Sequence, residues 1–141
     1  MQRKAFAAWH GGIRHGSGTL TTESKVLSNT PYSFATRFEA APGTNPEELL
    51  GAAHAGCFTM ALSLILGEAG ITPEKIDTGA TVTLEKQAGG HAITRVHLDV
   101  TVKATGADRA RFNEAAEKAK VNCPLSKVLR AEISMDAKLA A

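Results

Sequence analysis

Two cysteines are the side chains of this sequence whose type and position could carry redox or metal chemistry. Cys57 lies in the uncharged segment GAAHAGCFTMALS, residues 51–63, and Cys123 directly precedes Pro124. Proline favours the first position of a helix, so Cys123 is predicted to be an N-cap, where free backbone N–H groups stabilise a thiolate. This position favours redox chemistry. Cys57 by itself is equally compatible with a buried packing residue, because free cysteine is among the most buried residue types.

A reactive Cys57 needs a cation nearby, because a thiol with a pKa of about 8.5 is only a few per cent ionised at neutral pH. Two side chains could supply it. Arg37 lies in ATRFEA, before the helix that carries Cys57, and His54 lies three residues before Cys57 on the same helix face. Arg37 is also compatible with a solvated strand residue. For His54 the leading interpretation is a core histidine whose ring has a hydrogen-bond partner.

Two other chemistries would use the same side chains. A zinc site built from His54, Cys57 and Cys123 has too few ligands at a recognisable spacing. A cysteine hydrolase with His54 as the base lacks a third, orienting group at a suggestive spacing. We therefore rank both below redox chemistry and expect neither a bound metal nor a bound cofactor.

The helix that carries Cys57 is the best-defined element of the sequence. In GTNPEELL, Asn45 suits the N-cap and Pro46 the first helical position, and the two glutamates that follow suit the positively polarised first turn. The helix is predicted to cover residues 46–69 and to end near Gly70. It is apolar nearly all round, so we expect it to be buried at the centre of the fold.

The strands of the sequence are predicted from composition and alternation. Short β-rich segments separated by Gly, Asn and Pro predict three strands, at 3–9, 18–24 and 32–38. Clean alternation of apolar and polar residues predicts a hairpin of two more, at 80–86 and 91–104.

The last part of the sequence adds two helices and a strand. An amphipathic pattern predicts a helix at 107–121, followed by a short helix from Pro124 and a final strand at 133–139. The sum is an α+β protein with about six strands, rich in antiparallel pairs, packed on the long central helix. All of it is expected to form one domain, 1–141.

Burial of the central helix on all sides raises a packing problem. A helix of this length spans about 36 Å, and one six-stranded layer in a chain of 141 residues cannot surround it. A second copy of the chain could. The helix offers a run of small residues that let another helix backbone approach closely: Gly51, Ala52, Ala53, Ala55 and Gly56. We therefore predict an intertwined homodimer.

Charge and composition exclude several classes of protein. The 16 basic and 14 acidic residues are scattered and give a net charge of +2, so we expect no nucleic acid or anionic membrane as a partner. Residues 49–66 approach the length of a membrane span, but polar residues and glycines interrupt them and a carboxylate lies at either end. The start MQRKAFAAWHGG contains no apolar stretch of a secretory signal, which predicts a cytoplasmic protein.

Two longer blocks resemble the OsmC branch of the OsmC/Ohr peroxidase family. They are RFEAAPGTNPEELLGAAHAGCFTMALS and NCPLSKVL, and the likeness extends over nearly the whole chain, from WHGGIRHGSGTLTTES to AEISMDAKL. Gly56, where the family more often has alanine, is a departure from the pattern. The resemblance implies an OsmC-like, homodimeric thiol peroxidase that reduces organic hydroperoxides, and hydrogen peroxide less readily, to alcohol and water.

The resemblance also implies roles for individual residues. In the family the cysteine of the AAHAxCF block is peroxidatic and that of the CPxS block is resolving, which correspond to Cys57 and Cys123. The arginine of TRFE and the first glutamate of TNPEE correspond to Arg37 and Glu47. Arg37 would hold Cys57 as a thiolate and stabilise the departing alkoxide, with Glu47 fixing its aim. Cys123 would close a disulfide on the Cys57 sulfenic acid, and an external dithiol, a lipoyl group by the resemblance, would reopen it.

Helix geometry places a condition on these roles. Ten residues separate Glu47 from Cys57, which is about 15 Å along a helix and about 80° around it. The two do not share a site within one chain unless Arg37 spans the gap. Two antiparallel copies of the helix, however, would bring Glu47 of one chain opposite Cys57 of the other. We therefore predict a composite site at the dimer interface.

The uncharged surroundings of Cys57 suit a pocket for an apolar peroxide. The residues predicted to line it are His54, Phe58, Met60, Leu49 and Leu50, although apolar side chains on a buried helix are usually core. A second function stays open: a redox-sensing or small-ligand binding module that the same disulfide switches without turnover. Only the enzyme consumes peroxide in excess over protein when a dithiol is supplied.

Overall fold

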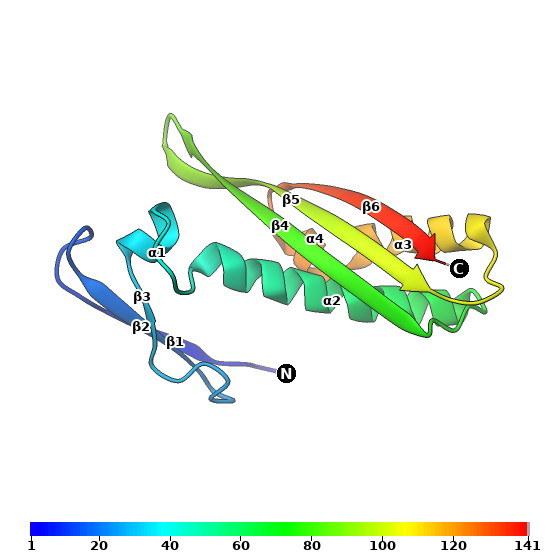
Figure 1. The fold of residues 1–141 in the computed structure, drawn as a ribbon, viewed down its shortest axis with the longest axis horizontal. Coiled ribbons are helices and arrows are strands. Elements are labelled where there is room, and N and C mark those ends of the chain that lie inside the picture. The colour runs from blue at the N-terminus through cyan, green and yellow to red at the C-terminus, as the bar shows by residue number, and fades with distance from the viewer. Residues whose placement is uncertain (141) are drawn as a thin grey trace. The chain divides into compact units, whose positions relative to one another are not determined.

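The computed structural model describes residues 1–140, which fall into two compact units. The N-terminal unit covers Met1–Leu49, and the C-terminal unit starts at Leu50 (Figure 1). The dividing point lies in the first turn of the long helix α2, Pro46–Glu68. This helix agrees with the predicted one to within a residue at its C-terminal end.

The N-terminal unit is built on a small antiparallel sheet of three strands in the order β1-β2-β3. The strands are β1 Ala5–His10, β2 Ser17–Thr22 and β3 Thr30–Tyr32. Gly18 in β2 pairs with Trp9 on one side and with Tyr32 on the other. The two aromatic rings meet over this glycine with their centroids 5.5 Å apart. A Cβ atom at Gly18 would collide with both rings, so the register depends on a residue without a side chain.

The predicted third strand, 32–38, is wrong over most of its length. The strand β3 stops at Tyr32, and a short helix α1, Phe34–Phe38, follows. The reason is a capping box: the Ser33 hydroxyl accepts a hydrogen bond from the Thr36 N–H, and the Thr36 hydroxyl accepts one from the Ser33 N–H. These local bonds satisfy the helix N-terminus and outweigh the β-rich composition of the segment. They place Arg37 in the last turn of α1.

The C-terminal unit holds most of α2 and a second three-stranded sheet. Its further elements are the strands β4 Lys75–Gln87, β5 Gly90–Lys103 and β6 Glu132–Ala140 and the helices α3 Arg109–Asn122 and α4 Pro124–Val128. The sheet order is β4-β5-β6, with β4 and β5 antiparallel, as the predicted hairpin requires, and β5 and β6 parallel. The described residues therefore form six strands, the predicted number, although β3 shares only Tyr32 with the predicted strand 32–38. The strands form two sheets and not one layer.

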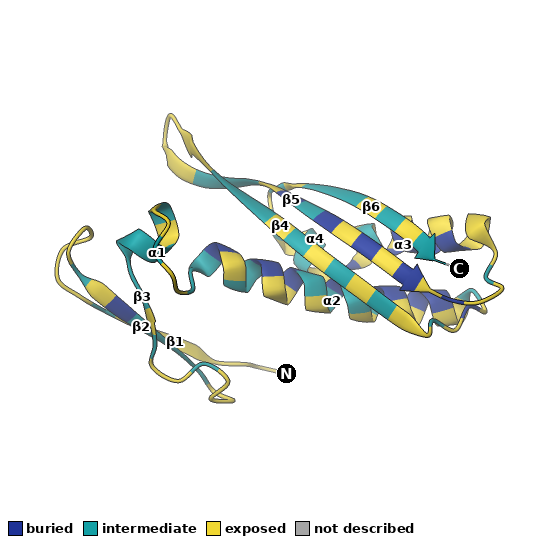
Figure 2. Cartoon of the chain, in the orientation of Figure 1, coloured by how far each residue is buried: buried dark blue, intermediate teal, exposed yellow. Residues whose placement is uncertain are grey.

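The core of this unit lies between one face of the sheet and the helices α2 and α3 (Figure 1). In β5 alternate residues are buried, which Figure 2 shows as a regular change of colour along the strand. The largest fully buried hydrophobic side chains come from α2, β5 and α3: Phe58, Leu62, Leu66, Val96, Leu98, Val100, Val102 and Phe112. The Ala115, Ala116 and Ala119 methyl groups complete the contact on α3.

Within the chain only one face of α2 is buried (Figure 2), which agrees with the expectation that one chain of this size does not surround the helix. Its other face exposes small and apolar residues at helical spacing, among them Ala53, Gly56, Met60 and Leu64. Met60 is 76% exposed and Leu64 is 65% exposed. The helix α2 is long and apolar enough to cross a membrane. Core helices of proteins that do not enter a membrane meet the same two criteria of length and composition. A helix this apolar with one open face needs something to cover it.

Candidate functional site

The two cysteines meet in the C-terminal unit. Cys57 lies in the middle of α2 and is half-buried, and Cys123 is fully buried at the junction where α3 ends and α4 begins. The Cys123 thiol donates a hydrogen bond to the Cys57 sulfur across 3.4 Å. Both are free thiols, and a disulfide bond, at about 2.05 Å, requires the two sulfurs to approach by little more than an ångström. The geometry therefore suits reversible formation of a disulfide between them.

The surroundings of Cys57 oppose its ionisation. Burial, followed by the hydrogen bond from Cys123, raises the pKa of the Cys57 thiol. The backbone N–H of Leu125, in the first turn of α4, acts in the opposite direction and lowers it. The free N–H groups of α4 were expected to serve Cys123, but its side chain makes no capping hydrogen bond, and it is Cys57 that receives one. No cation contributes to the shift among the described residues, so a reactive thiolate needs one from elsewhere.

A cation held in a fixed orientation is present in the N-terminal unit. The Arg37 guanidinium donates to Glu47 from two nitrogens, with Nη2 to Oε1 at 2.7 Å and Nε to both carboxylate oxygens at 3.2 Å. Glu47 is nearly buried, whereas the Arg37 side chain is 36% exposed. The pairing that the resemblance implied is therefore formed. A two-pronged contact of this kind fixes the plane of the guanidinium and leaves its remaining N–H donors free for another group.

The start of α2 holds this pair in place. Asn45 caps the helix by accepting the Glu48 N–H at 2.8 Å, and its side-chain amide donates to the Thr36 carbonyl of α1. Arg37 also lies over the Phe38 ring and borders a cavity of about 210 Å³ lined by aromatic side chains, including Trp9. The exposed side of the guanidinium therefore lies beside apolar surface.

His54 is a buried residue of α2 with one hydrogen-bond partner. Its Nε2 lies 2.8 Å from the Ser126 hydroxyl of α4, and its Nδ1 is buried without a partner among the described residues. Burial lowers the pKa of His54, so the ring is neutral at neutral pH and supplies no charge to Cys57. The leading interpretation of the sequence, a satisfied core histidine, is confirmed for its burial and for Nε2 but not for Nδ1.

An apolar cavity of about 490 Å³ opens directly at Cys57. It is lined by residues of α2 and of the junction between α3 and α4: Cys57, Met60, Ala61, Leu64, Ile65, Asn122 and Pro124. Met60 lies where the sequence predicted it. His54 and Phe58 are fully buried and do not line it, and the half-buried Leu49 and Leu50 are not among its residues either. Asn122 and Pro124 were missed, although their place beside Cys123 in NCP was a usable signal.

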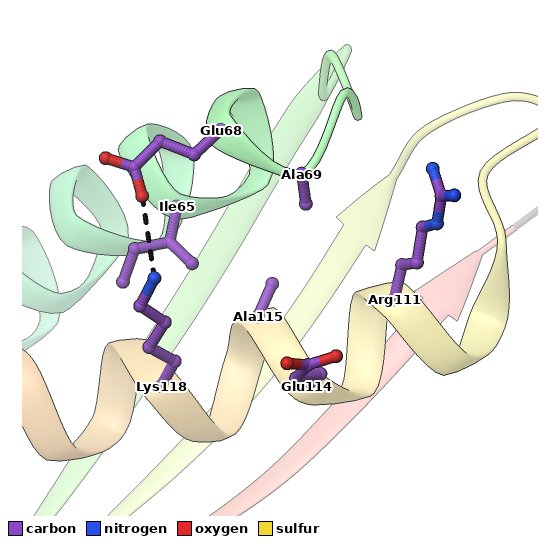
Figure 3. Close-up of a pocket in the computed structure, with 7 residues that line it drawn as sticks. All are labelled: Ile65, Glu68, Ala69, Arg111, Glu114, Ala115 and Lys118. Carbon is purple, nitrogen blue, oxygen red and sulfur yellow. Dashed lines mark ion pairs between the residues drawn. The ribbon is translucent and has the colours of Figure 1, made fainter.

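A second cavity lies between α2 and α3 (Figure 3). It holds about 160 Å³ and is bordered by charged side chains, of which Glu68 and Lys118 form an ion pair at 3.7 Å. Its lining contains no thiol, hydroxyl or imidazole. This cavity therefore offers no thiol for redox chemistry and is a weaker candidate than the one at Cys57.

One group of side chains has the spacing of metal ligands in the part of the chain that the structure describes. His97, Asp99 and Asp136 bring their ligand atoms within 4.8 Å of one another on the outer face of β5 and β6. The carboxylates are exposed, and the His97 Nδ1 lies 2.8 Å from the Ser134 hydroxyl. Neither cysteine belongs to this group, so it is separate from the thiol chemistry.

Two contacting thiols beside an apolar cavity, on an α+β fold, have the arrangement that two-cysteine redox chemistry requires. The chain belongs to the OsmC family, since the family described as OsmC-like protein matches residues 39–138. Peroxiredoxin OsmC of Escherichia coli (strain K12) is 54% identical over 139 residues, which cover 99% of this chain and 97% of that protein. The organic hydroperoxide resistance protein OhrB of Bacillus subtilis (strain 168) is 26% identical over 87% of this chain and 89% of its own length.

Solved structures agree with this family and with its fold. The crystal structure of OhrB from Bacillus subtilis matches with a TM-score of 0.67 and 26% identity, covering 97% of this chain and 98% of that one. An OsmC-like protein of unknown function from Vibrio cholerae matches with a TM-score of 0.77 and 18% identity, covering 98% and 99%. The resemblance seen in the sequence, and the α+β OsmC-like fold that it implied, are confirmed.

Proposed function

We propose that Cys57 and Cys123 carry out the two-step reduction of an organic hydroperoxide. The full-length relative in Escherichia coli is named a peroxiredoxin and more distant relatives are named organic hydroperoxide resistance proteins, so the chain is a peroxidase of this family. The observation that carries the residue assignment is the 3.4 Å contact between two free thiols at the mouth of an apolar cavity.

The reaction follows from the positions of the two sulfurs. The Cys57 thiolate attacks one peroxide oxygen, the O–O bond breaks, and the alkoxide leaves and is protonated to the alcohol. Cys57 is then a sulfenic acid. The Cys123 sulfur attacks it, forming the disulfide and releasing water. Cys57 takes the first role because it is half-buried and lines the cavity, whereas Cys123 is fully buried behind it.

The proposal assigns Arg37 to the first step. Cys57 needs a cation because burial raises its pKa, and the developing alkoxide needs hydrogen-bond donors. Arg37, aimed by Glu47, has both properties and borders apolar surface. Glu47 precedes Cys57 by ten residues of one helix, about 15 Å along its axis. We therefore place the Arg37–Glu47 pair of one chain at the Cys57 of a second chain, in a homodimer.

A homodimer also accounts for the open face of α2. Ala53 and Gly56 are small and exposed, so a second helix backbone can approach them closely. Packing two copies through this face would remove exposed apolar surface and bring each Cys57 near the first turn of the partner's helix.

The cavity at Cys57 supports a proposal for the substrate, and the family resemblance supplies one for the reductant. The cavity at Cys57 is lined mainly by apolar side chains, which favours an organic hydroperoxide over hydrogen peroxide. Reopening the disulfide requires two electrons from an external dithiol, and the proposed donor is a lipoyl group. We propose a cytoplasmic location, where reducing conditions keep both cysteines as thiols between turnovers.

A turnover assay tests the proposal. Reduced protein is mixed with tert-butyl hydroperoxide and dihydrolipoamide, and peroxide loss and intact mass are followed for wild type, Cys57→Ser and Cys123→Ser. We expect many turnovers in wild type, none in Cys57→Ser, and loss of two hydrogens from wild type when the dithiol is withheld. Oxidation of one equivalent without turnover would instead support the redox-sensing module, and an unreactive Cys57 would contradict both functions.

A further inference from the structure

The contact between His54 and Ser126 lies next to the thiol pair and, like it, starts from α2. His54 lies one turn before Cys57 on α2, and Ser126 lies three residues after Cys123, in α4. Within this short stretch α2 therefore makes two contacts, one with Cys123, which joins α3 to α4, through the sulfurs at 3.4 Å, and one with α4 itself through Nε2 and the hydroxyl at 2.8 Å. Between them the N–H of Leu125 reaches Cys57.

The helix α4 has few other means of staying in place. It has only five residues, none of them fully buried, and the side chain of its N-cap, Cys123, makes no capping hydrogen bond to its first turn. Leu125 and Leu129 contribute partly buried apolar contacts. The contact with His54 is the directional bond between side chains of the two helices, and it adds to the Leu125 N–H that reaches Cys57. Such a bond restrains α4 on α2, since apolar contacts allow sliding and a hydrogen bond does not.

We propose that His54 and Ser126 form a clamp that holds α4 on α2 and keeps the Cys123 sulfur within reach of oxidised Cys57. This inference rests on the proposed function. His54 and Ser126 are positioning residues for the second step, because neither touches the peroxide or exchanges a proton with it. Their role is to favour disulfide formation over further oxidation of Cys57.

The ring nitrogen of His54 that carries the proton decides between this positioning role and the chemistry of a hydrolase. A serine hydroxyl 2.8 Å from an imidazole resembles a nucleophile and its base. The buried Nδ1, however, has no partner among the described residues. A buried N–H left unpaired is less well tolerated than a bare acceptor, so the proton belongs on Nε2. In that form Nε2 donates to Ser126 and has no lone pair with which to accept its proton.

The clamp acts on a competition between two reactions of the Cys57 sulfenic acid. In the first, the Cys123 thiol condenses with it, giving the disulfide and one water molecule. In the second, another hydroperoxide transfers an oxygen to the same sulfur, giving the sulfinic acid and one alcohol, which the cell does not readily reverse. The first reaction depends on where α4 holds Cys123 and the second does not. Loosening α4 therefore shifts the products toward sulfinic acid.

Four substitutions test the clamp in two matched pairs. Ser126→Ala removes the hydroxyl, and Ser126→Thr keeps it. In His54→Asn the amide nitrogen falls near the position of Nδ1 and does not reach Ser126. In His54→Gln it falls near the position of Nε2 and restores the donor. In each pair one substitution removes the hydrogen bond and the other keeps it, while the size of the side chain changes little.

The measurement is the ratio of sulfinic acid to disulfide in intact protein. Reduced full-length protein is treated with excess tert-butyl hydroperoxide without dithiol, quenched and weighed by mass spectrometry. We expect Ser126→Ala and His54→Asn to raise the ratio about tenfold, the effect of losing one buried hydrogen bond. Ser126→Thr and His54→Gln should stay near wild type. The ratio does not depend on how fast Cys57 is first oxidised, because both products come from the same sulfenic acid.

The outcomes separate the clamp from the proposed function. If wild type forms the disulfide and all four variants give its ratio, the clamp is overturned and the peroxidase stands. If peroxide leaves wild-type Cys57 unchanged, the proposed function fails and the clamp fails with it. Should one disrupting variant not fold, the other pair of substitutions gives the same comparison.

Discussion

The two units of the chain carry different halves of the proposed chemistry. The N-terminal unit holds a charged pair, Arg37 and Glu47, whose cation is partly exposed. The C-terminal unit holds two thiols in apolar surroundings that raise the pKa of Cys57. A buried thiol without a cation is a poor nucleophile, and a cation already aimed by a carboxylate has donors to spare. The comparison teaches that each half is organised locally, and under the proposed mechanism reactivity depends on bringing the two together.

Removal of the Arg37 cation should have the largest effect on the rate at which Cys57 is oxidised. Arg37→Ala is expected to slow the oxidation of Cys57 by about 100- to 1,000-fold, because the thiolate and the leaving alkoxide both lose a donor. Loss of a cation also raises the pKa of Cys57, so the half-maximal rate should move to higher pH. The measurement is the rate of Cys57 oxidation between pH 5 and 9. The control is Arg37→Lys, which keeps the positive charge but not the two-pronged donor geometry of the guanidinium. An unshifted pH profile in Arg37→Ala would show that Arg37 does not act on Cys57.

Mixed dimers test whether the two halves come from different chains. A Cys57→Ser chain paired with a Glu47→Ala chain has one intact composite site, so each heterodimer should show about half of the wild-type activity. If the site lies within one chain, both sites of that heterodimer are damaged.

The matched control reverses this expectation. Wild type paired with a chain that carries both substitutions has no intact composite site, but it keeps one site if the residues act within a chain. Activity in the second pairing and not in the first would contradict the composite site. A monomeric mass at micromolar concentration would contradict the dimer itself.

Local signals predicted the elements that carry the chemistry. Asn45 and Pro46 define the start of α2, and alternation defines the hairpin of β4 and β5, because these signals act within a few residues. The start of α1 was missed because the capping box of Ser33 and Thr36 lies inside a β-rich segment. The resemblance to a known family supplied the pairing of Arg37 with Glu47, which spacing alone did not.

The features that were not predicted depend on contacts between distant segments. The sequence placed His54 beside Cys57 but did not indicate its partner Ser126, which lies 72 residues away. The N–H of Leu125 reaches Cys57 only because α4 packs on α2. The apolar composition of α2 indicates that its exposed face is covered, and its cover by a second copy of the chain stays a prediction.

The smallest expected effect concerns the stability of the C-terminal unit at low pH. Burial lowers the pKa of His54 below its unfolded value of about 6.5, so below that pH the unfolded chain binds a proton that the folded chain does not. Stability from this group is complete above about pH 6.5 and falls as the pH decreases, by at most about 1.4 kcal/mol per pH unit, until the folded pKa is reached.

The variant His54→Gln has no group at this position that titrates. The difference in unfolding free energy between wild type and His54→Gln, measured in urea at fixed protein concentration, should therefore be constant above about pH 6.5. Below it the difference should change in favour of the variant. If the unfolding free energies of wild type and His54→Gln change with pH in the same way down to pH 5, His54 accepts a proton as easily in the folded chain as in the unfolded one. That result would contradict a clamp in which Nδ1 is buried without a partner.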